Sequence, residues 1–401
     1  MLWTSALVKV DEEGDSLERA LADCCGQVRA GLAEQKPDLA IGFVSPHFVL
    51  EYERVPKLVK KALGARAFIG CSAGGLIGGG QEVERQPAVS ITAAVLPGVD
   101  TSPFHCDDDD LPDPDDPPDT WEKLVKVKQA EEPCFILLPD PFSIRVDNLV
   151  QGLDFAFPKA IKVGGLASGA NRPGLNALFL NDSTYHSGAV GLSLAGNVLV
   201  ETVVAQGCRP IGYAMRVTRC KSNFLYELDG EPAVNVLHDL LVGMPKHDQE
   251  LARNSLFLGV VMDEFKTDFK PGDFLIRNIL GVEPNSGALV VGEVLRNERT
   301  VQFHLRDAAT SADDLRLCLK HYCDAHGQRA AGALLFSCLG RGEHLYGRAN
   351  HDSECFREYM GETPLGGFFC NGEIGPVGGT TFLHGYTSSF GIFCAKPGAK
   401  V

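Results

Sequence analysis

The sequence lacks long apolar runs and is short of basic side chains. None of its apolar runs reaches about 18 residues, so we expect no transmembrane helix. Among 401 residues, 37 basic side chains face 52 acidic ones, which gives a formal net charge of −15. This balance argues against a nucleic-acid-binding protein and against an anionic membrane surface as partner, because both favour a basic face.

Several motifs of enzymes and metal proteins are missing as well. There is no P-loop, no clean dinucleotide-binding G-x-G-x-x-G, no C-x-x-C and no H-E-x-x-H. The segment 318–326 holds two cysteines and two histidines, but on a helix Cys323 would face away from the others, so we expect no metal. Gly70–Gly74 matches the G-x-S-x-G nucleophile elbow, yet a Gly-rich run follows where a helix should begin. A hydrolase therefore remains an alternative, and no catalytic residue is predicted.

The thirteen cysteines are scattered, mostly among apolar neighbours. A secreted disulfide framework would be denser and would occupy a shorter chain. The N-terminus also lacks the pattern of a signal peptide. We expect reduced thiols in the cytoplasm or another reducing compartment, which includes an organelle stroma if a transit peptide was removed.

One short segment carries about half of the net charge. Residues 105–119 hold eight aspartates, several prolines and no lysine or arginine. This composition predicts a solvated or disordered loop. If the protein were a scaffold, this loop would steer a basic partner toward it.

The most informative feature is an internal repeat within an ordinary globular composition of 44% hydrophobic and 22% charged residues. Each copy reads helix, buried strand, loop, helix, strand and Gly-rich loop. Copies one, two and three span residues 17–97, 121–196 and 312–393. Short β-type runs with one short helix fill residues 207–310. The sequence therefore predicts a mixed α/β fold of repeated units with an inserted β-rich segment.

The Gly-rich loops align on a small polar residue, namely Ser72, Ser168 and Asn371. A buried strand that leads into such a turn presents backbone N–H groups at the sheet edge, where an anionic or polar ligand group is received. The alternative is that the glycines only form tight turns.

Several polar side chains near these loops are candidates for ligand contact. Arg341 lies between glycines after a buried strand, and its guanidinium would hold a carboxylate through two parallel hydrogen bonds. Asn371 and Glu373 would receive an ammonium or amide group; a turn with Asn in a left-handed conformation is the alternative. Arg145 is a second candidate arginine. For both Arg341 and Arg145, the alternative is a surface arginine that pairs with a nearby acid. The full candidate set is Cys338, Arg341, Asn371, Glu373, His384, Ser72 and Arg145.

Several stretches make the chain resemble the FIST family of sensory domains. They include Phe68–Gly80, Phe336–Gly342 and, the longest, Pro364–Ser389; the others lie within 207–308. The resemblance implies a FIST N-terminal domain over 1–206, with the acidic loop, and a FIST C-terminal domain over 207–401, with the β-rich segment 207–310 and the third unit 311–401. It also implies binding of a small ligand, amino acids among them, and a signalling output; some members are haem proteins that sense nitric oxide.

These observations favour a soluble ligand-binding sensor or adaptor. We expect no fused output module, so the signal would pass to a separate protein partner or through oligomerisation, whose state the sequence does not predict. No cofactor is required by the sequence. A haem-binding gas sensor and a protein-interaction scaffold with a degenerate pocket remain the alternatives.

Overall fold

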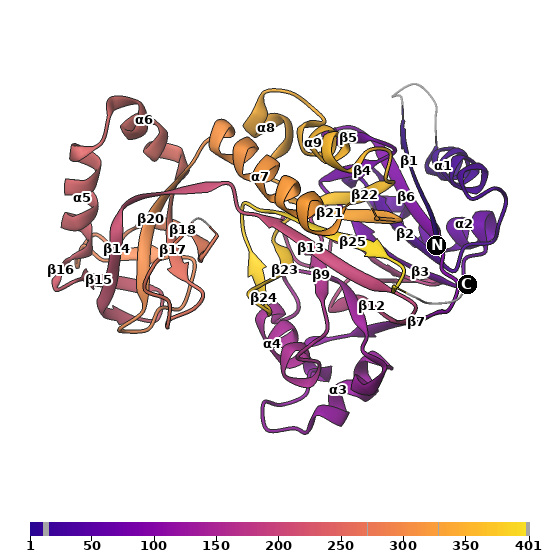
Figure 1. The fold of residues 1–401 in the computed structure, drawn as a ribbon, viewed down its shortest axis with the longest axis horizontal. Coiled ribbons are helices and arrows are strands. Elements are labelled where there is room, and N and C mark those ends of the chain that lie inside the picture. Colours follow the sequence, from indigo (N-terminus) through magenta and orange to yellow (C-terminus); the bar gives the residue numbers. More distant parts are fainter. Residues whose placement is uncertain (11–15, 271, 328, 398–401) are drawn as a thin grey trace. The chain divides into compact units, whose positions relative to one another are not determined.

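The computed structural model describes residues 1–10, 16–270, 272–327 and 329–397. They divide into two compact units (Figure 1). The first unit consists of 1–204, 318–383 and 387–401, and the second of 205–317 and 384–386. None of the described helices combines the length and the apolar character that crossing a membrane requires.

The sheet of copy one has a pair of parallel strands at its centre. Leu39–Val44 (β2) runs parallel to Ala67–Ser72 (β3), and the other neighbours are antiparallel. Helices α1 (Leu17–Gly31), η1 (Pro46–Arg54) and α2 (Val55–Leu63) accompany these strands. The strand order is β1 (Leu2–Lys9), β6 (Ala88–Val95), β2, β3, β10 (Leu178–Leu180) and β11 (Ser183–Tyr185).

Copies two and three repeat this plan within the described residues. In copy two the order is β24 (Thr380–His384), β23 (Glu373–Val377), β9 (Lys162–Gly165), β8 (Cys134–Pro139), β12 (Ala189–Gly196) and β7 (Val99–Cys106). In copy three it is β13 (Leu199–Ala205), β25 (Ser388–Cys394), β21 (Gly332–Cys338), β22 (Leu365–Cys370), β4 (Gly75–Gly78) and β5 (Gln81–Glu84). Their helices are η2 (Asp108–Asp110), α3 (Pro118–Val125), η3 (Gln129–Glu131), α4 (Val146–Ala156), α7 (Ala308–His326), α8 (Gly342–Tyr346) and α9 (His351–Met360).

Each copy lends a β-hairpin to the sheet of another copy. The hairpin β4–β5 of copy one pairs with β22 of copy three, β23–β24 of copy three pairs with β9 of copy two, and β10–β11 of copy two pairs with β3 of copy one. The exchange is cyclic, so each sheet is completed by a neighbour and the three copies form one interlocked unit.

The core of the first unit follows from strands that are buried on both faces. Every residue of β2, β3, β8 and β22 is buried, as are all residues of β21 except the half-buried Cys338, and such strands read as continuous apolar runs. One shared cluster joins side chains of all three copies, such as Ile41, Ile136 and Phe336. Separate outer clusters lie under α1 and α2 in copy one and under α3 and α4 in copy two.

The second unit contains a closed antiparallel barrel. Around it run β14 (Cys208–Lys221), β20 (Thr300–Arg306), β17 (Leu256–Val261), β18 (Phe274–Val282), β19 (Leu289–Val291) and β15 (Phe224–Leu228), with β16 (Glu231–Pro232) at the edge. The ring closes because β14 also pairs with β15. Helices α5 (Ala233–Gly243) and α6 (Lys246–Ser255) belong to this unit. The predicted mixed α/β fold class is thus confirmed.

Three local expectations need correction. The Gly-rich loops of copies one and three, residues 71–81 and 370–379, contain strands, because β4 lies inside the first and β23 inside the second. The helix α6 was missed since its sequence KHDQELARNS has almost no apolar periodicity. The acidic loop is ordered at its start, where the Asp107 side chain and the Asp110 side chain cap the short helix η2 reciprocally.

Candidate functional site

The three Gly-rich loops meet one another through backbone hydrogen bonds. The N–H groups of Ser168 and Gly169 donate to Ser72 O at 3.2 Å each, and Asn371 N–H donates to Leu166 O at 3.2 Å. The Ser168 hydroxyl adds one bond at each of these junctions: it donates to Phe369 O and accepts the N–H of Gly74 at 2.9 Å. These hydrogen bonds hold the copies together. When the parallel strand pairs of the three copies are aligned by their register, Gly74, not Ser72, is the counterpart of Ser168 and Asn371.

Ser72 belongs to a network of polar side chains in which Ser72, Asn176 and Asp140 are fully buried. Its hydroxyl accepts the N–H of Ala177 at 2.9 Å and donates to Asn176 Oδ1 at 3.3 Å. The Asn176 amide donates in turn to Asp140 Oδ1 at 2.8 Å, and Ser143 donates to the second oxygen at 2.6 Å. None of these side chains has a buried polar atom without a partner among the described residues.

Arg145, the second candidate arginine, lies on the surface beside the acidic loop. Its backbone N–H and its Nε both bond Asp108, at 2.8 Å and 2.9 Å to the nearest oxygens. These hydrogen bonds hold the pKa of Asp108 below its ordinary value. The structure thus places Arg145 in contact with an acid of its own chain.

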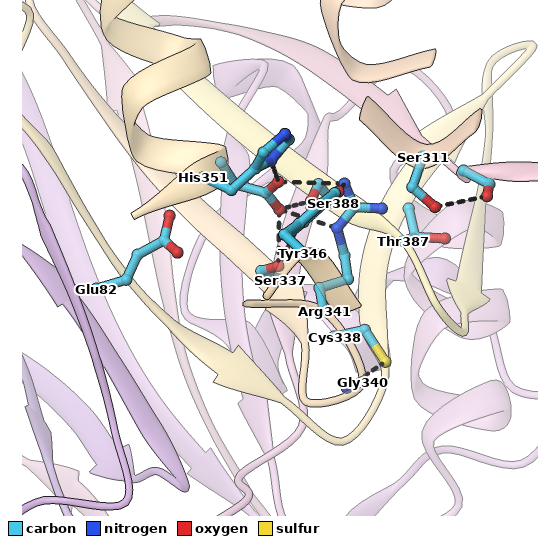
Figure 2. Close-up of polar contacts among 12 residues, drawn as sticks. Glu82, Ser311, Ser337, Cys338, Gly340, Arg341, Tyr346, His351, Thr387 and Ser388 are labelled. Atoms are coloured by element: carbon cyan, nitrogen blue, oxygen red, sulfur yellow. Dashed lines mark hydrogen bonds and ion pairs between the residues drawn. The ribbon is translucent and has the colours of Figure 1, made fainter. Parts of the chain in front are cut away.

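Arg341 is the largest fully buried side chain described in the structure. It follows β21 in a turn where Gly342 has φ 64°, a conformation that favours glycine, and a Cβ there would meet Glu84 Oε1 at 2.2 Å. This turn directs the guanidinium inward onto Asp352 in the first turn of α9. The Nε–Oδ2 distance is 2.9 Å and the Nη2–Oδ1 distance is 3.2 Å (Figure 2). The two-bond geometry expected for a ligand carboxylate is therefore taken by Asp352.

The Asp352 carboxylate is the centre of a larger hydrogen-bond network (Figure 2). Ser337 from β21 and Ser388 from β25 donate to its Oδ2 at 3.2 Å and 2.6 Å, and His351 Nδ1 lies 2.9 Å from its Oδ1. Burial alone would raise the pKa of Asp352, but Arg341 and these donors hold it well below the ordinary value. The pair is thus an ionised carboxylate and a guanidinium, fully buried. The Tyr346 ring stacks on His351 at 3.5 Å between centroids, and its hydroxyl bonds Arg341 Nη2.

A second buried acid, Glu82, enters this region on the hairpin borrowed from copy one. Its Oε1 accepts the N–H of Ser353 at 2.6 Å. Burial, followed by the nearby charge of Asp352, raises the pKa of Glu82 to about 8. At neutral pH this carboxyl is therefore mostly protonated, beside an Asp352 that is ionised.

Three polar atoms of this cluster have no hydrogen-bond partner within the part of the chain that the structure describes. They are Arg341 Nη1, Glu82 Oε2 and the Ser353 hydroxyl, and each is buried. Buried polar groups nearly always have a partner, which is either protein or an ordered molecule in the space beside them. This cluster is therefore incomplete in a way that the Ser72 network is not.

The remaining candidates lie at the ends of neighbouring strands. Cys338 and Glu373 both bond the backbone of Thr387: Cys338 N–H donates to Thr387 O, and Thr387 N–H donates to Glu373 Oε2, both at 3.0 Å. Asn371 follows β22, the strand parallel to the one that ends at Cys338. The structure thus brings Cys338, Arg341, Asn371 and Glu373 into one region of the first unit. His384 is buried and belongs to the second unit.

Sequence reasoning missed the acids that complete the cluster. Asp352 and Glu82 are 11 and 259 residues from Arg341 in the chain, and neither stands in a recognised motif. One signal was available for Asp352: an arginine predicted inside a Gly-bounded turn after a buried strand needs a nearby acid when it is buried. No local signal marks Glu82, because only the hairpin exchange brings it here.

Comparison with known proteins places the chain in a family. Residues 38–231 match the FIST N domain and residues 233–376 match the FIST C domain. An uncharacterised protein of Mycobacterium tuberculosis is 36% identical over 381 residues, which cover 94% of this chain and 96% of that protein. An uncharacterised protein of Mycobacterium bovis is 35% identical over 379 residues, or 94% and 95% of the two chains. The chain therefore belongs to the FIST family, whose domains are associated with sensory signalling.

Proposed function

We propose that this protein is a ligand-responsive sensory protein that binds a small molecule beside Arg341 and passes the signal to a separate protein partner. The observation that carries the proposal is the Nη1 atom of Arg341, which is buried and has no partner among the described residues. A buried N–H donor without an acceptor costs about 1–3 kcal/mol, so an acceptor oxygen of a ligand has a clear energetic role there.

The residues around Arg341 limit the chemistry of this ligand. Asp352 already neutralises the guanidinium, so the ligand receives one charge-assisted hydrogen bond and not a full ion pair. Asn371 adds an exposed amide in the same region. We therefore propose a small molecule with a carboxylate or another acceptor oxygen; an amino acid satisfies this requirement.

The first test is native mass spectrometry of gently purified protein together with its absorbance spectrum. A mass above the 43.1 kDa of the chain that is lost on denaturation would identify the ligand directly. Visible absorbance would point to a pigment such as haem instead of a colourless carboxylate. A bare chain mass in every preparation would argue for a ligand that dissociates during purification, which equilibrium titration then tests.

The second test substitutes Arg341 without removing its charge. Arg341→Lys keeps a cation opposite Asp352 but removes the Nη1 donor, so the affinity for the ligand should fall at least tenfold, about 1.4 kcal/mol. Arg348→Lys is the matched control, because Arg348 is exposed and pairs with Glu354. Calorimetry that shows equal affinity for both variants and the parent protein would remove Arg341 from the site.

A further inference from the structure

The turn of each borrowed hairpin provides a place to compare the copies. In copy one the turn Asn181–Asp182 of β10–β11 and the last turn of α2 line a cavity of about 260 Å³. Within it Lys60 Nζ lies 2.8 Å from Asp182 Oδ2. The cation of helix α2 in copy one is thus paired with an acid of the hairpin that copy two contributes.

The corresponding place in copy three can be located from helix ends and turn positions. Each helix is followed by a capping glycine. Gly64 caps α2 and its N–H donates to Lys60 O, and Gly361 caps α9 and its N–H donates to Arg357 O. Arg357 therefore occupies the position of Lys60. Asp182 is the second of two residues between β10 and β11, and Gly80 is the second of two residues between β4 and β5. Hence a glycine stands in copy three where copy one has an aspartate.

This substitution leaves the copy-three cation without its acid. Arg357 Nη1 lies 3.7 Å from the point where a Cβ of Gly80 would be, so it faces the place of the missing side chain. No described carboxylate forms an ion pair with Arg357. Beside it is a cavity of about 250 Å³, whose lining includes Ser5, Gly79, Gly80, Ser353, Arg357 and Glu362.

A second observation concerns Ser353, which belongs to the Arg341 cluster and also borders this cavity. Ser353 is one of the residues that line it, and this residue is only 4% exposed. Its Oγ has no hydrogen-bond partner among the residues that the structure describes. Arg357 and Ser353 therefore border one cavity, whose counterpart in copy one contains the Asp182 carboxylate.

We propose that this cavity binds a small oxoanion, a carboxylate or a phosphate group, which takes the place that the Asp182 side chain has in copy one. Arg357 supplies charge-assisted hydrogen bonds and Ser353 supplies its hydroxyl. Glu362 also lines the cavity and opposes the anion, so it limits the affinity. The site shares Ser353 with the Arg341 cluster, but neither Arg341 nor Asp352 lines the cavity, and the proposal does not depend on the ligand proposed beside Arg341.

The sharpest test restores the missing acid. Gly80→Asp would pair with Arg357 and fill the site from within, whereas Gly80→Asn has the same size and meets the same backbone demand, since Gly80 has φ 76° and both residues tolerate this region. Acetate and inorganic phosphate are titrated separately in calorimetry at constant ionic strength. We expect at least tenfold weaker binding in Gly80→Asp than in Gly80→Asn.

Variants that each remove one charge test whether the affinity for an anion changes in opposite directions at Arg357 and Glu362. Arg357→Gln should weaken binding at least tenfold, and Glu362→Gln should strengthen it several-fold, because one removes attraction and the other removes repulsion. Both side chains are exposed, so the fold should persist. Arg348→Gln, an exposed arginine outside the cavity lining, should leave the affinity unchanged.

The two ions also identify the source of the oxoanion. Tighter binding of acetate assigns a carboxylate ligand, and tighter binding of phosphate assigns a phosphate ester or phosphate itself. The proposal is overturned if neither ion gives heat or raises the unfolding temperature of the parent protein. It is equally overturned if binding survives in both Gly80→Asp and Arg357→Gln.

Discussion

The Ser72 network and the Arg341 cluster are both buried and polar, but they differ in completeness. In the first, Ser72, Asn176 and Asp140 satisfy one another and the backbone around them. In the second, Arg341 and Glu82 each keep a buried atom without a partner among the described residues. Buried polar networks thus have two roles in this protein. The complete network fixes the junction of two copies, and the incomplete one leaves a hydrogen-bonding atom unsatisfied, which a ligand can pair with.

The largest expected effect comes from removing the acid at the centre of the incomplete cluster. Asp352→Asn leaves the guanidinium of Arg341 buried without a counter-charge, which should lower the free energy of unfolding by about 3–5 kcal/mol in urea titrations. The matched change Asp140→Asn in the complete network strands no cation and should cost about 1–3 kcal/mol. Equal losses in the two variants would show that charge pairing does not distinguish the clusters.

Glu82→Gln tests the same cluster through the pH dependence of stability. The pKa of Glu82 rises from 4.5 to about 8 on folding, so the native state holds a proton that the unfolded chain has lost between these values. Raising the pH through this window therefore destabilises the parent protein, by up to about 1.4 kcal/mol per pH unit. Gln carries no charge, so its advantage in unfolding free energy should grow from pH 5 to pH 8 and be absent below pH 4. A pH-independent difference would contradict the assignment.

Ser72→Ala probes the complete network and should have a moderate effect. It leaves the Ala177 N–H and Asn176 Oδ1 without their buried partner, which should cost about 1–3 kcal/mol of unfolding free energy. Ligand affinity, measured by calorimetry on the variant that still folds, should not change. A loss of affinity with unchanged stability would move Ser72 into the binding site.

The smallest effect is expected at Arg145. Its pair with Asp108 is solvent-exposed, and such pairs contribute little to stability. Arg145→Ala should leave both the unfolding midpoint and ligand binding unchanged. Weaker ligand binding in this variant would show that the acidic loop takes part in recognition.

The repeated strands and helices could be predicted because their evidence is local. Strands such as 38–45 and 134–139 are apolar runs bounded by turn residues, and Leu17–Leu32 shows helical spacing. The inserted β-rich segment was visible from the same kind of pattern. These signals depend on residues a few positions apart, so one sequence suffices.

The hairpin exchange and the partners of Arg341 could not be predicted because their evidence is distant in the chain. Strand β4 pairs with β22 nearly three hundred residues later, and the periodicity of neither strand specifies that partner. The same exchange delivers Glu82 to α9 and Gly80 to Arg357. Arg341 was singled out by its glycines, yet its acid, Asp352, depends on how α9 packs.

Three copies that exchange hairpins in a circle are the single-chain counterpart of a homotrimer. In a homotrimer one substitution alters every junction at once, whereas joined copies can diverge independently. Here the turns of the exchanged hairpins differ. One carries Asp182, which pairs with Lys60, and another presents Gly80 to Arg357. The third is Gly378–Gly379, and Thr381 in the strand after it bonds Asp154. The second turn residue is Asp182 in one hairpin and a glycine, Gly80 or Gly379, in the other two, so joined copies can use matching positions for different purposes.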